Sequence, residues 1–168
     1  MSIIKNFIFI IFITTFISQV NGEEIKKMGN HKDWETYIIN SETGKVCFAQ
    51  TKPVLQSPKV NKREARLFVS FRPNDKVTNE ISTTSGYEFN SQNSILATSG
   101  KKKYKFDIVQ DGFAWISSNK VEKKMIKSMK KGSRIMVTAY NKSGSQTIDH
   151  YSLLGFTKAY NTAKKSCT

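Results

Sequence analysis

An apolar segment near the N-terminus constrains this chain most, because it decides which residues fold and in which compartment they do so. Lys5 precedes an apolar run at residues 7–17, and Gly22 is a small residue at a suitable distance beyond it. A positive start, an apolar stretch of this length and a small residue before the cut are typical of a secretory signal peptide. We therefore predict a signal peptide at residues 1–22 and an exported chain that begins at Glu23.

The alternative is that this segment stays attached as a membrane anchor. A spanning helix needs about 20 apolar residues, and the eleven positions of the core run are too few, although residues 3–20 taken together leave a retained anchor open. No cysteine directly follows the cut, which excludes lipid attachment there, and the sequence holds no second apolar segment of this kind. We predict a periplasmic or secreted protein that is not an integral membrane protein after cleavage.

The mature chain, residues 23–168, has the length of one domain, and a chain of this size buries about two thirds of the surface that it exposes when unfolded. Loss of Lys5 lowers the formal net charge from +14 to +13. Such a charge ordinarily suggests nucleic acid, anionic lipid or acidic polysaccharide as a partner.

The kind of basic residue gives this charge a second interpretation. Lysine accounts for 23 of the 27 basic residues and arginine for four, alongside abundant Asn, Ile and Ser. An AT-rich genome produces this composition, whereas a surface selected to bind phosphates is expected to use more arginine. The charge is therefore either a binding feature or a consequence of genome composition.

Two cysteines, Cys47 and Cys167, lie 120 positions apart in a chain predicted to reach an oxidising compartment. This spacing is not that of a CxxC redox centre, and two cysteines alone are too few for a structural zinc site. We predict a disulfide between them, which chain-entropy models value at roughly 5 kcal/mol at most.

Alternating apolar and polar residues predict a protein built mainly of strands. Residues 23–32 are polar and are expected to be a loose lead-in. Residues 53–64 contain Pro53 and Pro58 and end in a charged stretch, and are expected to be a surface loop. The strands are expected at residues 34–39, 46–50, 67–71, 80–84, 94–98, 103–108, 113–116, 134–140 and 146–152.

The clearest hairpin of the sequence turns at Asp111 and Gly112, a pair typical of a two-residue type I′ turn. Such a loop pairs Ile108 with Trp115. The pattern then places a set of apolar side chains on one face, which we expect to be buried: Tyr104, Phe106, Ile108 and Trp115.

Helical spacing occurs twice. One apolar stripe consists of Val121, Met125, Ile126 and Met129, between Ser118 or Asn119 as a cap and Gly132 as an end. A C-terminal helix carries a second stripe, which Cys167 shares: Phe156, Ala159, Tyr160 and Ala163. We predict a mainly β, single domain, a sandwich or barrel-like fold of about eight to ten strands with two helices, the C-terminal one closing the sheet.

Candidates for nucleophilic catalysis are few. Ser117 with Lys120 and Ser128 with Lys131 fit the S-x-x-K spacing of serine-lysine enzymes, but no K-T-G or S-D-N element accompanies them. A chain rich in Ser and Lys produces this spacing by chance. We expect neither pair to be catalytic.

Asp149, His150 and Ser152 supply the residue types of a catalytic triad, but adjacent strand residues point to opposite faces. Asp149 is thus not expected to orient the His150 ring. His31 is the one other histidine, and the carboxylates are scattered, so no metal site and no cofactor are predicted. A pair of carboxylates for glycoside chemistry stays open, although the sequence selects none.

Lysines gather in two places, a predicted turn and one side of the first predicted helix. They are solvated surface residues or a binding site for an anionic surface such as lipopolysaccharide, glycan or membrane. Export, and the inward position of the nearby aromatic residues, argue against nucleic acid. The candidate residues are Lys101, Lys102, Lys103, Lys105, Lys120, Lys123, Lys124, Lys127, Lys130 and Lys131.

The order of short motifs along the chain resembles the invasion-associated locus B family of alphaproteobacterial exported proteins. Their order and spacing, rather than any single motif, carry this resemblance, which covers essentially the whole mature chain. The matching motifs are Trp34, KVCFA at 45–49, FVSFRP at 68–73, NEIS at 79–82, GY at 86–87, AWI at 114–116, MKKG at 129–132, GSQT at 144–147, Asp149, SLLGF at 152–156, Ala159 and Cys167.

The resemblance implies an exported protein, named for a role in host-cell invasion in pathogenic relatives, with no catalytic residues to carry over. Some relatives have further cysteines soon after the tryptophan, which this chain lacks. We expect a non-catalytic protein that binds an envelope or host component. The alternatives are a periplasmic hydrolase acting on glycan or peptide, and a structural or chaperone-like envelope factor.

Overall fold

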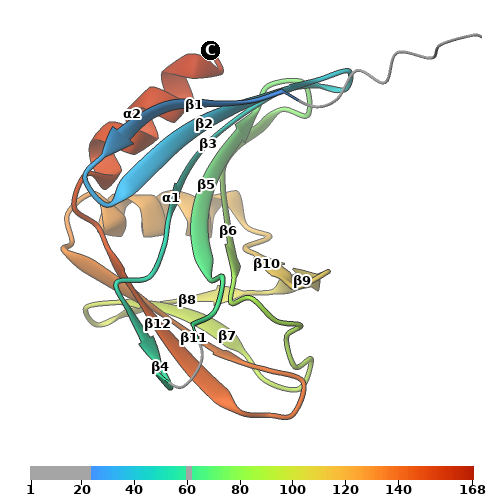
Figure 1. Cartoon of the computed structure of the whole chain (residues 1–168), viewed down its shortest axis with the longest axis vertical. Coiled ribbons are helices and arrows are strands. Elements are labelled where there is room, and N and C mark those ends of the chain that lie inside the picture. The colour runs from blue at the N-terminus through green and yellow to red at the C-terminus, as the bar shows by residue number, and fades with distance from the viewer. Residues whose placement is uncertain (1–23, 60–61) are drawn as a thin grey trace, which may run out of the picture.

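The computed structural model describes residues 24–59 and 62–168, and the predicted signal peptide lies outside these ranges. Two antiparallel sheets face each other, and the strands described form no closed barrel (Figure 1). The larger sheet runs in the order β1 (Glu24–His31), β2 (Trp34–Ser41), β3 (Gly44–Thr51), β5 (Arg66–Arg72), β6 (Val77–Thr84), β10 (Phe113–Trp115) and β9 (Ile108–Gln110).

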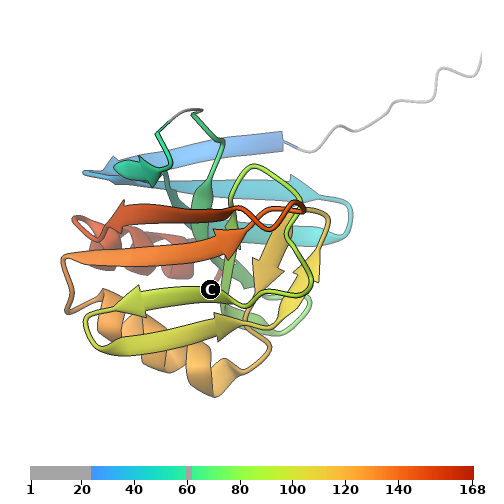
Figure 2. The same ribbon diagram turned by 90° about the horizontal axis from the view of Figure 1, so that it is seen from below.

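The smaller sheet has five strands, and Figure 2 shows it from below. Its order is β4 (Leu55–Ser57), β12 (Gln146–Ser152), β11 (Arg134–Tyr140), β7 (Ile95–Ser99) and β8 (Lys102–Phe106). The helices are α1 (Asn119–Met129) and α2 (Phe156–Ser166). The mainly β fold with two helices is therefore confirmed.

The core lies between the sheets and the two helices because each strand buries one of its two faces. On α2 the four predicted stripe residues are buried, and the Phe156 ring lies 4.8 Å from that of fully buried Trp34. The indole of Trp34 donates a hydrogen bond to the Ser152 carbonyl at 2.9 Å, which ties the larger sheet to the end of β12.

The disulfide between Cys47 on β3 and Cys167 after α2 is present, with Cα atoms 5.8 Å apart. This distance lies within the normal range for a bridge. The bridge holds the C-terminal helix against the buried face of the larger sheet, as predicted. Within the described ranges, no helix is long and apolar enough to cross a membrane.

The prediction of a loose lead-in is wrong, because residues 24–31 form β1. This strand pairs with β2 from Glu24 opposite Asn40 to His31 opposite Trp34. Most of its side chains are exposed, and Ile25 is 61% exposed. An edge strand that is solvated on both faces shows no alternation of apolar and polar residues. The sequence therefore does not predict its pairing with β2.

The predicted loop at residues 53–64 contains the short strand β4, which adds to the edge of β12. The expected buried face of the Asp111 hairpin is wrong in part. Ile108 pairs with Trp115 as predicted, but Ile108 is 47% exposed and Trp115 is half-buried. The chain passes from the smaller to the larger sheet at Asp107, so the face that buries Tyr104 and Phe106 does not continue.

Candidate functional site

The serines of the two S-x-x-K motifs are occupied by structural hydrogen bonds. The Ser117 hydroxyl donates to the Asp107 carboxylate at 2.6 Å, and the hydroxyls of Ser128 and Tyr104 are 2.7 Å apart. Among the hydrogen bonds of the described residues, neither serine contacts a lysine amine. These contacts hold a strand junction and a helix in place and do not prepare a nucleophile.

Asp149 and His150 lie on opposite faces of β12, as the alternation predicts. Asp149 is fully buried and receives two hydrogen bonds from the Arg63 guanidinium, at 2.6 and 3.0 Å. Arg63 also donates to the Ser85 carbonyl at 3.0 Å and lies over the Tyr87 ring. This buried ion pair joins β12 to the segment before β5, and the sequence did not reveal it because the partners are 86 positions apart.

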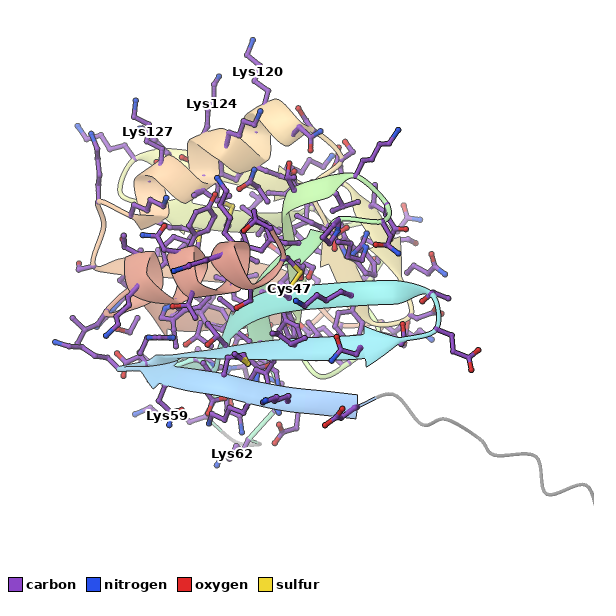
Figure 3. All side chains as sticks on the ribbon, turned by 90° about the horizontal axis from the view of Figure 1, so that it is seen from above. Cys47, Lys59, Lys62, Lys120, Lys124 and Lys127 are labelled. Atoms are coloured by element: carbon purple, nitrogen blue, oxygen red, sulfur yellow. A yellow bond between two sulfur atoms is a disulfide. The ribbon has the colours of Figure 1, made fainter. Side chains whose placement is uncertain are left out.

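The two lysine clusters come together on one side of the molecule, although they are far apart in the chain. Lys102, Lys103, Lys124 and Lys127 surround a hollow of about 530 Å³ whose floor includes Tyr104. A second hollow extends this region along the turn between β7 and β8 to the C-terminal end of α1. Figure 3 shows Lys120, Lys124 and Lys127 of α1 projecting away from the body of the protein.

We call the lysines that line these hollows, and a third one beside α2, the basic surface. Its members are Lys101, Lys102, Lys103, Lys123, Lys124, Lys127, Lys130 and Lys131. Lys105 and Lys120 are exposed on the same strand and helix but line none of the three hollows. The Lys105 charge contributes to a lowered pKa at Asp107, which results mainly from the hydrogen bonds that Ser117 donates.

Hydrogen bonds between β8 and α1 hold the two elements that carry the basic surface together. The Tyr104 hydroxyl on β8 contacts Ser128 at 2.7 Å and donates to the Lys124 carbonyl at 3.4 Å, so strand and helix are joined beneath the lysines. The opposite side of α1 buries Met125, Ile126 and Met129 in the core. The helix therefore presents its lysines in a constant orientation.

The charge of the basic surface is not neutralised nearby. No acidic residue lines any of the three hollows, and none of these lysines takes part in an ion pair between described residues. The Lys130 amine lies 3.8 Å from the Tyr160 ring centroid, and burial, followed by the charge of Lys164, lowers its pKa. Positive charge thus continues from α1 onto α2.

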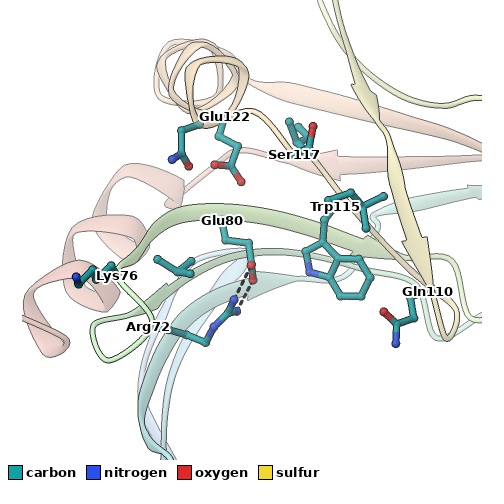
Figure 4. Close-up of a pocket in the computed structure, with 11 residues that line it drawn as sticks. Arg72, Lys76, Glu80, Gln110, Trp115, Ser117 and Glu122 are labelled. Atoms are coloured by element: carbon teal, nitrogen blue, oxygen red, sulfur yellow. Dashed lines mark hydrogen bonds and ion pairs between the residues drawn. The ribbon is translucent and has the colours of Figure 1, made fainter.

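A different hollow, of about 450 Å³, lies on the face of the larger sheet that points away from the core (Figure 4). Arg72 donates to both oxygens of Glu80 at 2.6 and 2.8 Å, and Trp115 lies beside this pair. Lys76 lies at one end of the hollow, and Ser117 lines it where α1 begins.

Glu122 on α1 borders the hollow at Arg72, Glu80 and Trp115, and it is 3% exposed. One of its oxygens accepts a hydrogen bond from the Ile81 N–H at 2.9 Å. Burial raises the Glu122 pKa to about 7, although this hydrogen bond acts in the opposite direction. The sequence analysis missed Glu122; its spacing of three and seven residues from Met125 and Met129 was the signal that placed it on the buried stripe.

The residue types that commonly bind metals are scattered in the described part of the chain. Across residues 24–59 and 62–168, no three His, Cys, Asp or Glu side chains are grouped so that they could hold a metal ion. His31 lies against the Thr36 hydroxyl at 3.2 Å, and burial lowers its pKa. His150 is half-buried on β12.

A family profile and a solved structure both resemble this chain. A family profile described as invasion associated locus B (IalB) protein matches residues 34–164. The crystal structure of invasion associated protein b from Bartonella henselae superimposes with a TM-score of 0.59 at 14% sequence identity, covering 84% of this chain and 97% of that chain. At this identity the likeness shows a shared fold. No curated protein matches the chain.

Proposed function

The chain belongs to the invasion associated locus B family, and from that premise we propose that it is an exported, non-catalytic protein that binds an anionic envelope or host component. The basic surface is the binding site. Its ligand is an anionic lipid or glycan, and lipopolysaccharide combines both chemistries. Periplasm or secretion is the location that the predicted signal peptide and the disulfide favour.

One observation carries this proposal. Two lysine clusters that are separate in sequence line adjoining hollows, with no acidic residue among the lining residues. Exposed charges act together only within a Debye length, about 8 Å at physiological salt, so contiguous lysines attract an anionic surface where scattered ones do not. Each lysine close to such a surface contributes about 1 kcal/mol.

A matched pair of double variants tests the proposal. Lys124 and Lys127 lie on the basic surface, whereas Lys59 and Lys62 project from the opposite side of the molecule in Figure 3. Replacing Lys124 and Lys127 with Gln is expected to weaken binding to anionic phospholipid vesicles or lipopolysaccharide about thirtyfold at low salt. Replacing Lys59 and Lys62 removes the same charge and is expected to change binding much less.

Binding is measured by vesicle co-sedimentation at several salt concentrations, with thermal unfolding of each variant as a check on folding. Equal losses in the two variants would show that only net charge matters. No binding by the unaltered protein at low salt would refute the proposal and leave the lysine content as a consequence of genome composition.

A further inference from the structure

Five aromatic side chains form a continuous row on the outward face of the larger sheet. Ring centroids are separated by 5.3 Å from Tyr37 to Phe48, 6.1 Å on to Phe68, 6.2 Å on to Phe113 and 5.8 Å on to Trp115. The rings come from β2, β3, β5 and β10, and the row passes over β6, which lies between β5 and β10. It reaches the hollow beside Arg72 and Glu80, because Trp115 belongs to both.

These rings belong to the face that the core does not use. Their strand neighbours Ile38, Ala49, Val69 and Ala114 are fully or almost fully buried, whereas Phe113 is 37% exposed and the other four rings are half-buried. Both helices pack on the buried face: α1 buries its apolar stripe in the core, and α2 places Phe156 and Tyr160 against buried rings. The described elements leave the row open.

Polar groups lie beside part of the row, and the apolar pair Ile39 and Val46 lies beside Tyr37 and Phe48 on the same face. Strand register places Gln50 opposite Phe68, and Ser70 opposite Phe48. Glu35 joins one side, where it accepts hydrogen bonds from Tyr37 and Gln50. The other side leads to the ion pair of Arg72 with Glu80. The row therefore combines aromatic rings with neighbouring hydrogen-bonding groups.

The charges beside the row cancel locally, unlike those of the basic surface. Lys27 pairs with Glu35, Arg66 with Glu64, and Arg72 with both Asp75 and Glu80. An anionic ligand is therefore drawn to the lysines and not to this face. The row itself offers no net charge, which suits a neutral ligand.

We propose that the aromatic row, together with the hollow at Arg72, Glu80 and Trp115, is a binding site for a neutral chain of hexopyranose units. Such a sugar ring has an apolar C–H face, which packs on an aromatic ring, and hydroxyl groups at its edge. The aromatic rings of the row suit the C–H face of the sugar. The carboxylate, guanidinium and amide groups beside the row suit its hydroxyl groups. This site is separate from the basic surface and does not depend on it.

Titration with neutral hexasaccharides tests the site, with chitohexaose, cellohexaose and maltohexaose as probes. Trp34 is fully buried and Trp115 is half-buried, so a ligand on the row is expected to alter the fluorescence of Trp115. At least one probe is expected to bind, and Phe68→Thr is expected to weaken that binding at least about tenfold. Calorimetry provides a reading that does not depend on the tryptophan.

The matched control is Ile25→Thr, which removes an apolar side chain that is 61% exposed on the edge strand β1 and outside the row. It is expected to leave binding unchanged. The double replacement of Lys124 and Lys127 with Gln is also expected to bind the hexasaccharide normally, which separates this site from the proposed function.

The proposal is overturned if none of the three hexasaccharides binds, or if Phe68→Thr and Ile25→Thr weaken binding equally. Binding of a neutral, aromatic-rich peptide in place of all three sugars would also overturn it and would identify the row as a protein interface.

Discussion

Replacement of Glu122 by Gln tests whether this buried carboxyl is protonated in the folded protein. The Glu122 pKa is about 7 in the folded protein against an ordinary value of 4.5. The folded state therefore holds a proton that the unfolded chain releases between these two values. The resulting stabilisation is complete below the lower value and is lost as the pH rises through the higher one.

The size of the effect follows from this displacement of the pKa. A shift of this size corresponds to about 3.4 kcal/mol when each pH unit contributes about 1.36 kcal/mol. Glu122 borders a hollow that is open to water, and solvent reduces the effect, so we expect a loss of about 2 kcal/mol. For a domain of this size, that loss lowers the melting temperature by about 5 °C.

The glutamine introduced by Glu122→Gln stays neutral at every pH and keeps an oxygen that accepts the hydrogen bond from the Ile81 N–H. The free energy of unfolding of this variant, measured by urea titration, is expected to exceed that of the unaltered protein by only about 0.5 kcal/mol near pH 5. It should exceed it by about 2 kcal/mol near pH 8. The charge of Glu80 across the hollow also raises the Glu122 pKa, so this repulsion is part of the measured difference.

Glu42→Gln is the matched control, because Glu42 is exposed in the turn between β2 and β3. Its difference from the unaltered protein is expected to vary little between about pH 5 and pH 8. A difference for Glu122→Gln that stays constant across this range would refute the reasoning, since it would mean that Glu122 titrates alike in the folded and unfolded chain.

Two further predictions concern cross-links between distant segments. Replacing both Cys47 and Cys167 with Ala is expected to lower the free energy of unfolding by about 2–4 kcal/mol, measured by urea titration under oxidising conditions, and equal stability of the two proteins would contradict it. Asp149→Ala is expected to cost about 3–5 kcal/mol, because it leaves the Arg63 guanidinium without its buried partner. The double variant Arg63→Met with Asp149→Leu should recover part of that loss, and a loss below about 1 kcal/mol for Asp149→Ala would contradict the role of the pair.

Sequence patterns predicted the elements that bury one face and expose the other. The strands around Val69 and Val137 and the stripe of α2 that begins at Phe156 follow this rule, so alternation or helical spacing recorded their burial. The predicted disulfide could be placed because Cys167 shares that stripe. In each case the spacing of apolar residues within one strand or helix was enough for the prediction.

Features that depend on partners distant in sequence could not be predicted in this way. β1 buries no face of its own and is placed by its pairing with β2, and the pairing of Arg63 with Asp149 joins segments 86 positions apart. Phe48 and Phe68 have apolar neighbours on the opposite strand face, so their strands appear as continuous apolar runs. Such runs do not show which of the two faces the core covers.

The placement of acidic residues argues against genome composition as the whole explanation of the positive charge. Composition can supply lysines, but it does not decide where carboxylates lie. In the described structure every ion pair either borders the aromatic row or is the buried pair of Arg63 with Asp149. The basic surface receives none, although it contains eight lysines in adjoining hollows. If acidic residues were placed at random, some would be expected beside the basic surface as well as beside the aromatic row. The difference in charge between the two surfaces would then be smaller. Each surface suits a different ligand chemistry, and the two sets of variants measure them separately.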